Sequence, residues 1–389
     1  PSVLVIALSP FPTATRSRKA ALTFARSGWH TRYLGLSAVG RTNKSAPSGT
    51  TAHDGITTHL VDVPKLRTAP GLSTHITNTL RAYAPALFRM ARIVLTTEAD
   101  VVHVVTMPLA PLGAMHKRRF GSHFTLDVTE RPGAVAASGS LAGLFAKIEK
   151  PLLGWARPYV DLATAVVKPD VQILLASGYQ RAALVRNAPM TDWRAPFVPS
   201  PPGPMRFLVI GSIFEGRGYE MLVEAAARAR THAEFTIHIY GPGRDEYVDR
   251  LRVRSAERGL GDVIFWHGPT SSSDVSATYL SGHVGLVLYE SDDPGNDGLS
   301  NKILECVATG RPVLAGDLPQ NREFVEEHGV GWLSPMTTED LASSLVQVAS
   351  CSAEQLTGLS AHARSLGDTT LSWEADFQSV LDIAGRSKR

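Results

Sequence analysis

Short, uninterrupted apolar runs alternate along the chain with longer segments in which apolar residues recur at helical spacing. The first run, SVLVIAL at residues 2–8, has the length and composition of a parallel strand buried on both faces. A proline-containing loop follows, then a helical stretch over about 15–26 that ends before Gly28, then a second strand at 31–36. This order of strand, helix and strand predicts an α/β protein with a parallel sheet covered by helices.

The same alternation continues to the end of the chain. Further strands are predicted at 57–63, 100–105, 123–128, 162–167, 206–210, 235–240, 262–266, 284–289 and 312–315. Further helices are predicted at 74–97, 140–158, 178–186, 219–230, 245–258, 273–281, 300–309 and 372–385.

A proline-rich stretch divides these elements into two α/β halves. Residues 189–204 contain six prolines, which restrict φ and lack an amide proton, so a linker is predicted at 191–204. A length of 389 residues also suggests two domains, at about 100–200 residues each. The expected bounds are 1–190 and 205–370, with a final segment at 371–389. Because open α/β sheets bind ligands at the carboxyl ends of their strands, a cleft between the two domains is the expected site.

Composition and charge narrow the classes of function. The apolar content of 43% is that of a globular protein, and the formal charge of +3 is too small to argue for nucleic acid. That charge fits an anionic small molecule or an anionic membrane surface. Two cysteines support neither a disulfide framework nor a zinc cluster, and no metal site is expected. The chain shows no apolar run of about 20 residues and no signal-peptide pattern at its start. A cytoplasmic protein is therefore expected, with peripheral contact to the inner face of a membrane as an alternative.

The segment DGLSNKILECVATGRPVLAG, residues 297–316, carries the most specific pattern. It follows a predicted strand and the acidic loop ESDDPGND. Gly298 lets a ligand approach the backbone, and Ser300 can cap the following helix, whose unpaired amides suit a phosphate. Lys302 lies three residues before Glu305, so the two side chains can share a helix face.

This segment resembles the donor-binding signature of the family-4 retaining glycosyltransferases, which have the GT-B fold of two Rossmann-like domains facing each other across a cleft. The signature has two glutamates separated by seven residues, then small residues and Gly-x-Pro-Val. Here Asp297 occupies the first carboxylate position and Glu305 the second, and residues 310–313 match the end. The resemblance implies that Glu305 holds the ribose hydroxyls, and that Asp297 and the loop amides hold the donor sugar. Aspartate is one methylene shorter than glutamate, so Glu290 is the alternative for the sugar contact.

A second matching stretch, FLVIGSIFEGRGYEMLVEAA at residues 207–226, resembles the phosphate loop of the same family. Arg217 stands where relatives have lysine, and Ser212 stands where many have arginine. Arginine can bind a phosphate through two N–H groups at once. Lys302 is expected to supply the second positive charge. With these cations and the helix start near Gly298, the leaving diphosphate can be stabilised without a metal.

The resemblance implies a glycosyltransferase (EC 2.4 type) that moves a sugar, hexosyl or related, from a UDP- or GDP-sugar to a hydroxyl acceptor, with retention of configuration and no cofactor. The acceptor would be a small molecule or a lipid-linked glycan, as in polysaccharide or glycoconjugate biosynthesis. The N-terminal domain would bind the acceptor and the C-terminal domain the donor. The final helix, with Trp373, would cross back to the N-terminal domain.

The candidate site residues fall into three groups. The donor-nucleotide candidates are Gly211, Ser212, Arg217, Gly241, His267, Gly268, Gly298, Leu299, Ser300 and Glu305. The acceptor-side candidates are Phe11, Arg16 and His103. The catalytic candidates are Asp127, Glu130, Asp297, Arg217 and Lys302.

Some of these patterns have a structural alternative. Asp127 and Glu130 stand near a position where many relatives have histidine, and they could instead cap the turn in ERPG. His103 is typical of a buried histidine at a strand end. Residues 81–95 hold three arginines among apolar residues and suit either a membrane surface or a core-facing helix with a solvated basic face. The second alternative is favoured because Pro85 is expected to interrupt the helix.

Two other functions fit a GT-B fold. A sugar-nucleotide epimerase would need carboxylates and histidines facing the C2 atom of the sugar, and the family-4 signature argues against it. A non-catalytic sugar-nucleotide-binding or assembly protein is suggested by Ser212 and Asp297, which depart from the family pattern. Slow hydrolysis of a UDP- or GDP-sugar would indicate a transferase, whereas binding without turnover would indicate the non-catalytic protein.

Overall fold

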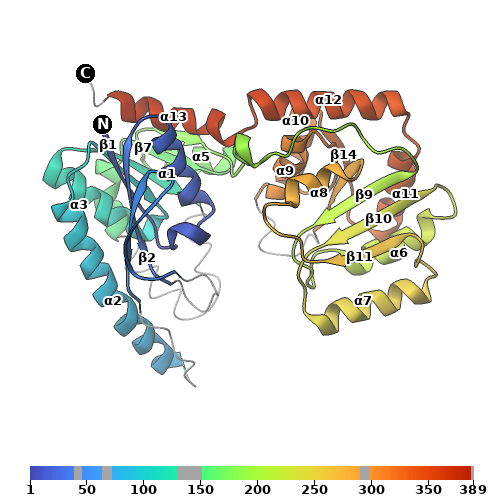
Figure 1. Ribbon diagram of the computed structural model, residues 1–389, viewed down its shortest axis with the longest axis horizontal. Helices are drawn as coiled ribbons and strands as arrows, with labels where there is room; N and C mark the ends of the chain where they lie inside the picture. The colour runs from blue at the N-terminus through green and yellow to red at the C-terminus, as the bar shows by residue number, and fades with distance from the viewer. Residues whose placement is uncertain (39–45, 64–71, 130–150, 290–297, 387–389) are drawn as a thin grey trace. The chain divides into compact units, whose positions relative to one another are not determined.

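A computed structural model describes residues 1–38, 46–63, 72–129, 151–289 and 298–386, with the backbone alone for residues 72–82 (Figure 1). Internal contacts divide the chain into two compact units. Unit 1 comprises residues 1–186 together with 376–389, and unit 2 comprises residues 187–375. Both ends of the chain therefore belong to unit 1.

Unit 1 is built on an eight-stranded sheet in the order β3-β4-β2-β1-β5-β6-β7-β8. All neighbouring strands pair in parallel except β3, which forms an antiparallel hairpin with β4. The strands are β1 Ser2–Ile6, β2 His30–Leu36, β3 Gly49–His53, β4 Ile56–Val61, β5 Val101–Val105, β6 His123–Val128, β7 Leu162–Ala165 and β8 Ala182–Leu184.

Helices cover both faces of this sheet. On one face, α2 (Leu72–Thr96), α3 (Ala110–Phe120) and α5 (Lys168–Ala176) pack against alternate strand residues in one apolar core. On the other face lies α1 (Arg16–Arg26), whose Phe24 contacts His103 of β5. In the described part of unit 1, these elements are connected by the 3-10 helices η1 Phe11–Thr13, η2 Met107–Leu109 and η4 Arg157–Tyr159.

Unit 2 is built on a six-stranded parallel sheet in the order β11-β10-β9-β12-β13-β14. Each face of this sheet carries an apolar core. Helices α6, α7 and α11 pack against one face, and α8, α9 and α10 pack against the other. The strands are β9 Met205–Ile210, β10 Phe235–Tyr240, β11 Ile264–Gly268, β12 Val284–Val287, β13 Val313–Gly316 and β14 Gly331–Ser334. The helices are α6 Tyr219–Ala229, α7 Asp245–Glu257, α8 Val275–Leu280, α9 Asn301–Thr309, α10 Pro319–His328, α11 Thr338–Ala349 and α12 Ala353–Thr369, with the 3-10 helix η5 at Thr191–Trp193.

The last helix, α13 (Trp373–Gly385), begins in unit 2, and its residues from Asp376 onward belong to unit 1. Arg186 donates its backbone N–H (2.8 Å) and its guanidinium (2.9 and 2.7 Å) to the Asp376 carboxylate. The Phe377 ring packs edge-on against the rings of Phe24 and His103, with centroids 5.4 and 5.6 Å away. The C-terminal segment therefore completes the core of unit 1.

Local patterns predicted most of the regular elements, but the element predicted at 178–186 was wrong. The expected helix at 178–186 is instead strand β8, and helix α5 precedes it. The sequence AAL has no strand propensity of its own, but pairing of Ala182 with Ala163 of β7 makes it the edge of the sheet. Of the helix expected at 140–158, residues 151–156 are helical and the part before 151 lies outside the described residues.

Pro85 does not interrupt helix α2, contrary to the expectation from the sequence. A proline removes one backbone N–H, and here the rest of the helix is held by packing, because Ala86, Met90 and Val94 are buried in the core at intervals of four residues. On another side Phe88 is 67% exposed. Contact of α2 with a membrane surface stays a prediction. Among the described residues, no helix has both the length and the apolar character needed to cross a membrane.

Candidate functional site

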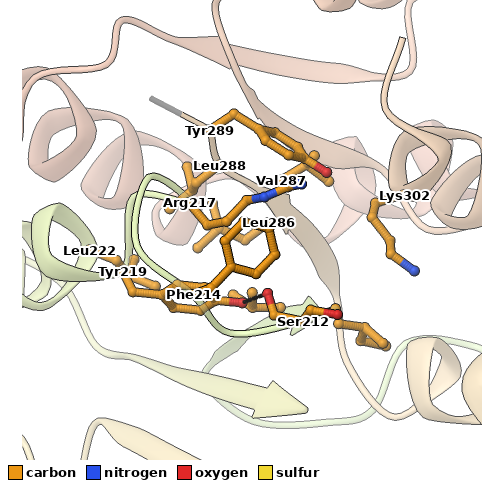
Figure 2. Close-up of a pocket in the computed structure, with 13 residues that line it drawn as sticks. Ser212, Phe214, Arg217, Tyr219, Leu222, Leu286, Val287, Leu288, Tyr289 and Lys302 are labelled. Atoms are coloured by element: carbon orange, nitrogen blue, oxygen red, sulfur yellow. Dashed lines mark hydrogen bonds between the residues drawn. The ribbon is translucent and has the colours of Figure 1, made fainter. Parts of the chain in front are cut away.

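A hollow of about 240 Å³ opens in unit 2 at the carboxyl ends of β9 and β12 (Figure 2). This is where a doubly wound sheet binds ligands, because the neighbouring chains leave the sheet toward opposite faces. The lining residues are Val209, Ile210, Gly211, Ser212, Phe214, Arg217, Tyr219, Leu222, Leu286, Val287, Leu288, Tyr289 and Lys302.

The loop from β9 to α6 depends on close backbone approach. The Gly211 N–H donates to the Tyr240 carbonyl at 2.9 Å, and a Cβ on Gly241 would lie 1.7 Å from the Gly211 carbonyl oxygen. At the other end of the loop Gly218 has φ +74°, and a Cβ there would lie 3.3 Å from Leu288. Glycine at these positions therefore keeps the loop pressed against the strand ends.

Arg217 lies between two aromatic rings at the wall of this hollow (Figure 2). Its guanidinium carbon is 4.5 Å from the centre of the Phe214 ring and 4.2 Å from that of the Tyr289 ring. Its Nε is buried and has no hydrogen-bond partner among the described residues. Stacking of this kind holds the cation in place without using its N–H groups, which point outward in the guanidinium plane. The guanidinium is thus positioned in advance to bind an anion.

Two helix starts accompany this cation. Helix α6 begins after Gly218, and no side chain caps its first amides. Helix α9 is capped by Ser300, whose Oγ accepts from the Lys302 N–H at 3.3 Å, which confirms the predicted cap. The Ser300 and Tyr289 hydroxyls are also hydrogen-bonded, at 3.2 Å. Helix N-termini carry partial positive charge and spare N–H groups, so both favour a phosphate at the hollow.

Lys302 and Glu305 share one face of α9, as their spacing predicted. The Lys302 Nζ lies 2.9 and 3.2 Å from the two Glu305 carboxylate oxygens. The Tyr279 hydroxyl donates to the same carboxylate at 3.3 Å, and burial raises the pKa of Tyr279, so this donor stays protonated. The Lys302 stem also reaches β9, because its Cε would lie 3.6 Å from a Cβ on Gly211. Lys302 thus brings a second cation to the first hollow, and its partner Glu305 lies behind it, outside the linings of both hollows.

A second hollow, of about 190 Å³, adjoins the first and shares Arg217 and Tyr289 with it. Its other lining residues are Gly298, Leu299, Ser300, Asn301, Leu318 and Asn321. The start of α9 and the start of α10 therefore form its walls. The two hollows together offer a charged compartment and a neighbouring, less charged one.

His267 and Gly268 lie at the carboxyl end of β11, next to Gly241. The Gly241 N–H donates to the Gly268 carbonyl at 2.8 Å. The His267 ring is parallel to that of Tyr240 (8°), with centroids 4.3 Å apart, and its Nε2 is 2.9 Å from Nδ1 of His238. These residues are outside the linings of both hollows but end neighbouring strands of the same sheet. Their predicted role beside the nucleobase stays a prediction.

The structure places Asp127 in the interior of unit 1, with 2% of its surface exposed. Arg16 donates to both of its oxygens, at 2.6 and 2.7 Å, and Thr164 donates to Oδ1 at 2.7 Å. Burial pushes the pKa of Asp127 upward, but the Arg16 guanidinium and the hydrogen bonds outweigh it, so the pKa lies below its ordinary value. The pair Arg16–Asp127 is therefore an internal ion pair of unit 1, and its expected role toward an acceptor stays a prediction.

Phe11 and His103 are also buried, with 2% and 0% of their surfaces exposed. The Phe11 ring packs edge-on against Tyr33 (centroids 5.1 Å apart). His103 packs between Phe24 and Phe377 and its Nδ1 is 2.8 Å from the Thr125 hydroxyl, in line with the structural alternative for this histidine. A contact of either with an acceptor stays a prediction.

Three predicted residues lie outside the described part of the chain: Glu130, Asp297 and the alternative Glu290. Sequence patterns did not single out several lining residues, among them Phe214, Tyr289 and Asn321. Tyr289 had a usable signal, since it ends a predicted strand, where this fold places ligand contacts. Phe214 and Asn321 had none, because their roles depend on neighbours that are distant in sequence.

Comparison with known proteins agrees with this geometry. The family described as Glycosyl transferases group 1 matches residues 204–350. No curated protein sequence matches the chain.

Several solved structures share the fold over nearly the whole chain. Sucrose-phosphate synthase from Thermosynechococcus elongatus is 16% identical, with a TM-score of 0.68, over 99% of this chain and 98% of the other. Anabaena HepE, solved with UDP and glucose, is 14% identical, with a TM-score of 0.68, over 99% of both chains. The lipopolysaccharide outer core galactosyltransferase WaaB is 16% identical, with a TM-score of 0.64, over the full length of both.

The family match lies within the unit that contains both hollows, and the structural likeness extends to unit 1. The chain therefore carries a group 1 glycosyltransferase domain in unit 2 and is a glycosyltransferase with the GT-B fold.

Proposed function

We propose that this glycosyltransferase uses a nucleoside-diphosphate sugar as donor and a hydroxyl compound as acceptor, with retention of configuration and without a metal ion. The observation that carries the proposal is Arg217, held between Phe214 and Tyr289 at the wall of a hollow that two helix starts adjoin. Such a site is built for a diphosphate, which is dianionic or more and accepts several hydrogen bonds. The structure of Anabaena HepE with UDP and glucose supports the same class of donor.

In this proposal each group in or beside the first hollow has a separate task. Arg217 and the amides at the starts of α6 and α9 neutralise the diphosphate, and Lys302 adds a second cation. Glu305 accepts hydrogen bonds from the ribose hydroxyls. A diphosphate held by these groups needs no metal to leave. Other roles stay predictions. They are hydrogen bonds from sugar hydroxyls to Asp297, a role for Asp127 or Glu130 toward the acceptor, and a lipid-linked acceptor at a membrane.

The proposed reaction exchanges one bond at the anomeric carbon. The bond from that carbon to the β-phosphate oxygen breaks, with its electron pair going to the phosphate. The acceptor oxygen forms a bond to the same face of the carbon, and its proton passes to the departing phosphate oxygen. The positive charges around the diphosphate favour this step because they stabilise the charge that develops on the leaving group.

The test is a panel of UDP-, GDP- and ADP-sugars, with nucleotide release measured by chromatography and nucleotide binding by calorimetry. Arg217→Ala should weaken nucleotide binding by about 1.5–3 kcal/mol, the usual worth of a hydrogen bond to a charged group. Arg250→Ala is the matched control, since Arg250 pairs with Glu215 on the surface and should leave binding unchanged. Absence of nucleotide binding by the wild type, or wild-type affinity in Arg217→Ala, would contradict the proposal.

A further inference from the structure

Asn321, in the first turn of α10, is an unusual residue in the lining of the second hollow. It is 1% exposed, it lines the hollow, and its Oδ1 has no hydrogen-bond partner among the described residues. Buried polar atoms are nearly always paired, because an unpaired acceptor loses its water without compensation. An unmet acceptor at the wall of a hollow therefore indicates a partner supplied by a ligand.

The hydrogen bond made by Nδ2 determines the orientation of the Asn321 amide. Its Nδ2 donates to the Gly316 carbonyl at 3.0 Å, and the same carbonyl accepts from the Leu318 N–H at 2.9 Å. A carbonyl oxygen can only accept, so the atom that faces it is the NH₂ group. Rotating the amide by half a turn would place two oxygens together. Oδ1 is thus held away from Gly316, and its lone pairs have no donor among the described residues.

The polar neighbours in this hollow do not satisfy that oxygen. The Ser300 hydroxyl is already hydrogen-bonded to Tyr289 and to the Lys302 amide. Leu299 and Leu318 contribute apolar surface. A ligand group here must therefore donate a hydrogen bond to Asn321 while its carbon skeleton rests on leucine side chains.

This requirement separates the two hollows chemically. A phosphate at neutral pH is almost entirely an acceptor, so the Oδ1 atom of Asn321 repels it in the second hollow. Arg217 lines both hollows, but Lys302, which also attracts a phosphate, lines only the first. A sugar hydroxyl can donate, and a sugar ring also presents C–H surface to leucines. The 190 Å³ hollow is smaller than the roughly 300–1,000 Å³ of sites that hold a whole drug-sized ligand, so it suits one part of a larger ligand.

We infer that Asn321 is a specificity-determining residue for the transferred sugar: its Oδ1 accepts a hydrogen bond from one sugar hydroxyl, with the diphosphate on the Arg217 side. This inference rests on the proposed function. It adds that the donor lies with its nucleotide and phosphates toward the first hollow and its sugar toward the start of α10.

The first test separates affinity for the sugar from affinity for the nucleotide. Calorimetry would compare UDP with UDP-glucose, or GDP with GDP-glucose if the wild type prefers guanine, in the wild type, Asn321→Leu and Asn321→Ala. Both variants should bind the free nucleotide within about twofold of the wild type and the sugar nucleotide about tenfold more weakly, as expected for one lost hydrogen bond. Gln320→Ala is the matched control, since Gln320 is half-buried in the same turn but lines neither hollow.

The second test leaves the protein unchanged and varies the ligand. The wild type would be titrated with the nucleotide-linked 2-, 3-, 4- and 6-deoxyglucoses. One of the four should bind about tenfold more weakly than the parent sugar nucleotide, and Asn321→Leu should show no loss for that same compound. This comparison does not depend on whether a variant folds as well as the wild type.

The outcomes distinguish this inference from the proposed function. Equal weakening of nucleotide and sugar nucleotide in both variants would make Asn321 a purely structural residue and overturn the inference alone. Unchanged affinity for the sugar nucleotide would do the same. Absence of UDP, GDP and ADP binding by the wild type would overturn the proposed function and the inference with it.

Discussion

Arg217 and Lys302 are both cations at the first hollow, but their surroundings differ. Arg217 is held by the faces of two aromatic rings, which leave its charge uncompensated. Lys302 is paired with Glu305, 2.9 Å away, and the side chains are 31% and 19% exposed. A diphosphate would gain the full attraction of Arg217, whereas its attraction to Lys302 is offset by the neighbouring carboxylate. At the residue scale, Arg217 is therefore expected to contribute most of the phosphate affinity.

Replacing Lys302 should accordingly have a smaller effect than replacing Arg217. Lys302→Met is expected to weaken binding of UDP by about 0.5–1.5 kcal/mol, because the lost attraction is that of a partly compensated, partly solvated charge. Calorimetry with UDP and with uridine would measure this, and uridine, which has no phosphate, should bind the variant as it binds the wild type. Unaltered UDP affinity would mean that Lys302 serves only to hold Glu305.

His103 should make the stability of unit 1 sensitive to acid. Burial lowers its pKa to about 4, so in the folded protein it stays neutral down to that pH, whereas in the unfolded chain it takes up a proton near pH 6.5. The unfolded state therefore binds more protons between these values, and the free energy of unfolding falls as the pH falls from about 6.5 to 4. At about 1.4 kcal/mol per pKa unit, the loss at pH 4.5 is on the order of 2–3 kcal/mol.

Denaturant unfolding at pH 7 and pH 4.5 would measure this loss. His103→Gln should show a smaller difference between the two pH values than the wild type, whatever its stability at pH 7. The exposed His30 supplies the control, since His30→Gln should keep the full difference. An equal pH dependence in His103→Gln and the wild type would exclude this histidine as the cause.

At the scale of elements, the proline-rich segment is bound to unit 2 rather than extended between domains. Arg311 directly follows Gly310, the C-cap of α9, and is fully buried. Its Nη2 donates to the carbonyls of Val198 (2.9 Å), Pro199 (3.3 Å) and Leu280 (3.0 Å). Burial lowers the pKa of Arg311 to about 10, so it is still charged at neutral pH. The start of α9 thus borders the second hollow, and Arg311, just after its end, holds the proline-rich segment.

Removing this anchor should release the segment. Arg311→Ala leaves three carbonyls without their donor, of which that of Leu280 is buried, and opens a cavity. We therefore expect a loss of about 2–4 kcal/mol in stability and faster tryptic cleavage after Arg194 or Arg206. Limited proteolysis with mass spectrometry would locate the cuts. Arg322→Ala, which removes an exposed pair with Asp317, is the control and should be cleaved like the wild type. The idea fails if Arg311→Ala is no more sensitive than this control.

At the scale of the whole molecule, two sheets with separate cores suggest two cooperative units. Scanning calorimetry should resolve two unfolding transitions, and saturating UDP or GDP should raise the midpoint of only one, since both hollows belong to unit 2. At a ligand concentration 100 times Kd the expected stabilisation is about 2.7 kcal/mol. A single transition, or equal shifts of two, would contradict this independence. A cleft between the units stays a prediction.

Features that depend on near neighbours in the chain could be predicted from the amino-acid sequence alone. Apolar runs predicted the strands β1, β9 and β10, and the GT-B resemblance predicted a fold that the solved structures bear out. The Ser300 cap also followed, because a cap side chain reaches the backbone amides two or three residues later. The shared face of Lys302 and Glu305 followed because a helix places side chains three or four positions apart on one face.

Features that join segments distant in the chain emerge only once the chain is folded. Arg217 meets Tyr289 because the sheet order places β12 beside β9, although β10 and β11 come between them in the chain. Arg16 and Asp127 pair across 111 residues, and an isolated charge of either kind looks exposed in a sequence. That Oδ1 of Asn321 lacks a hydrogen-bond donor can be recognised only when the positions of all neighbouring donors are known. Local patterns report the conformation of a few residues, whereas burial and partner choice arise from long-range packing, and that packing builds the site.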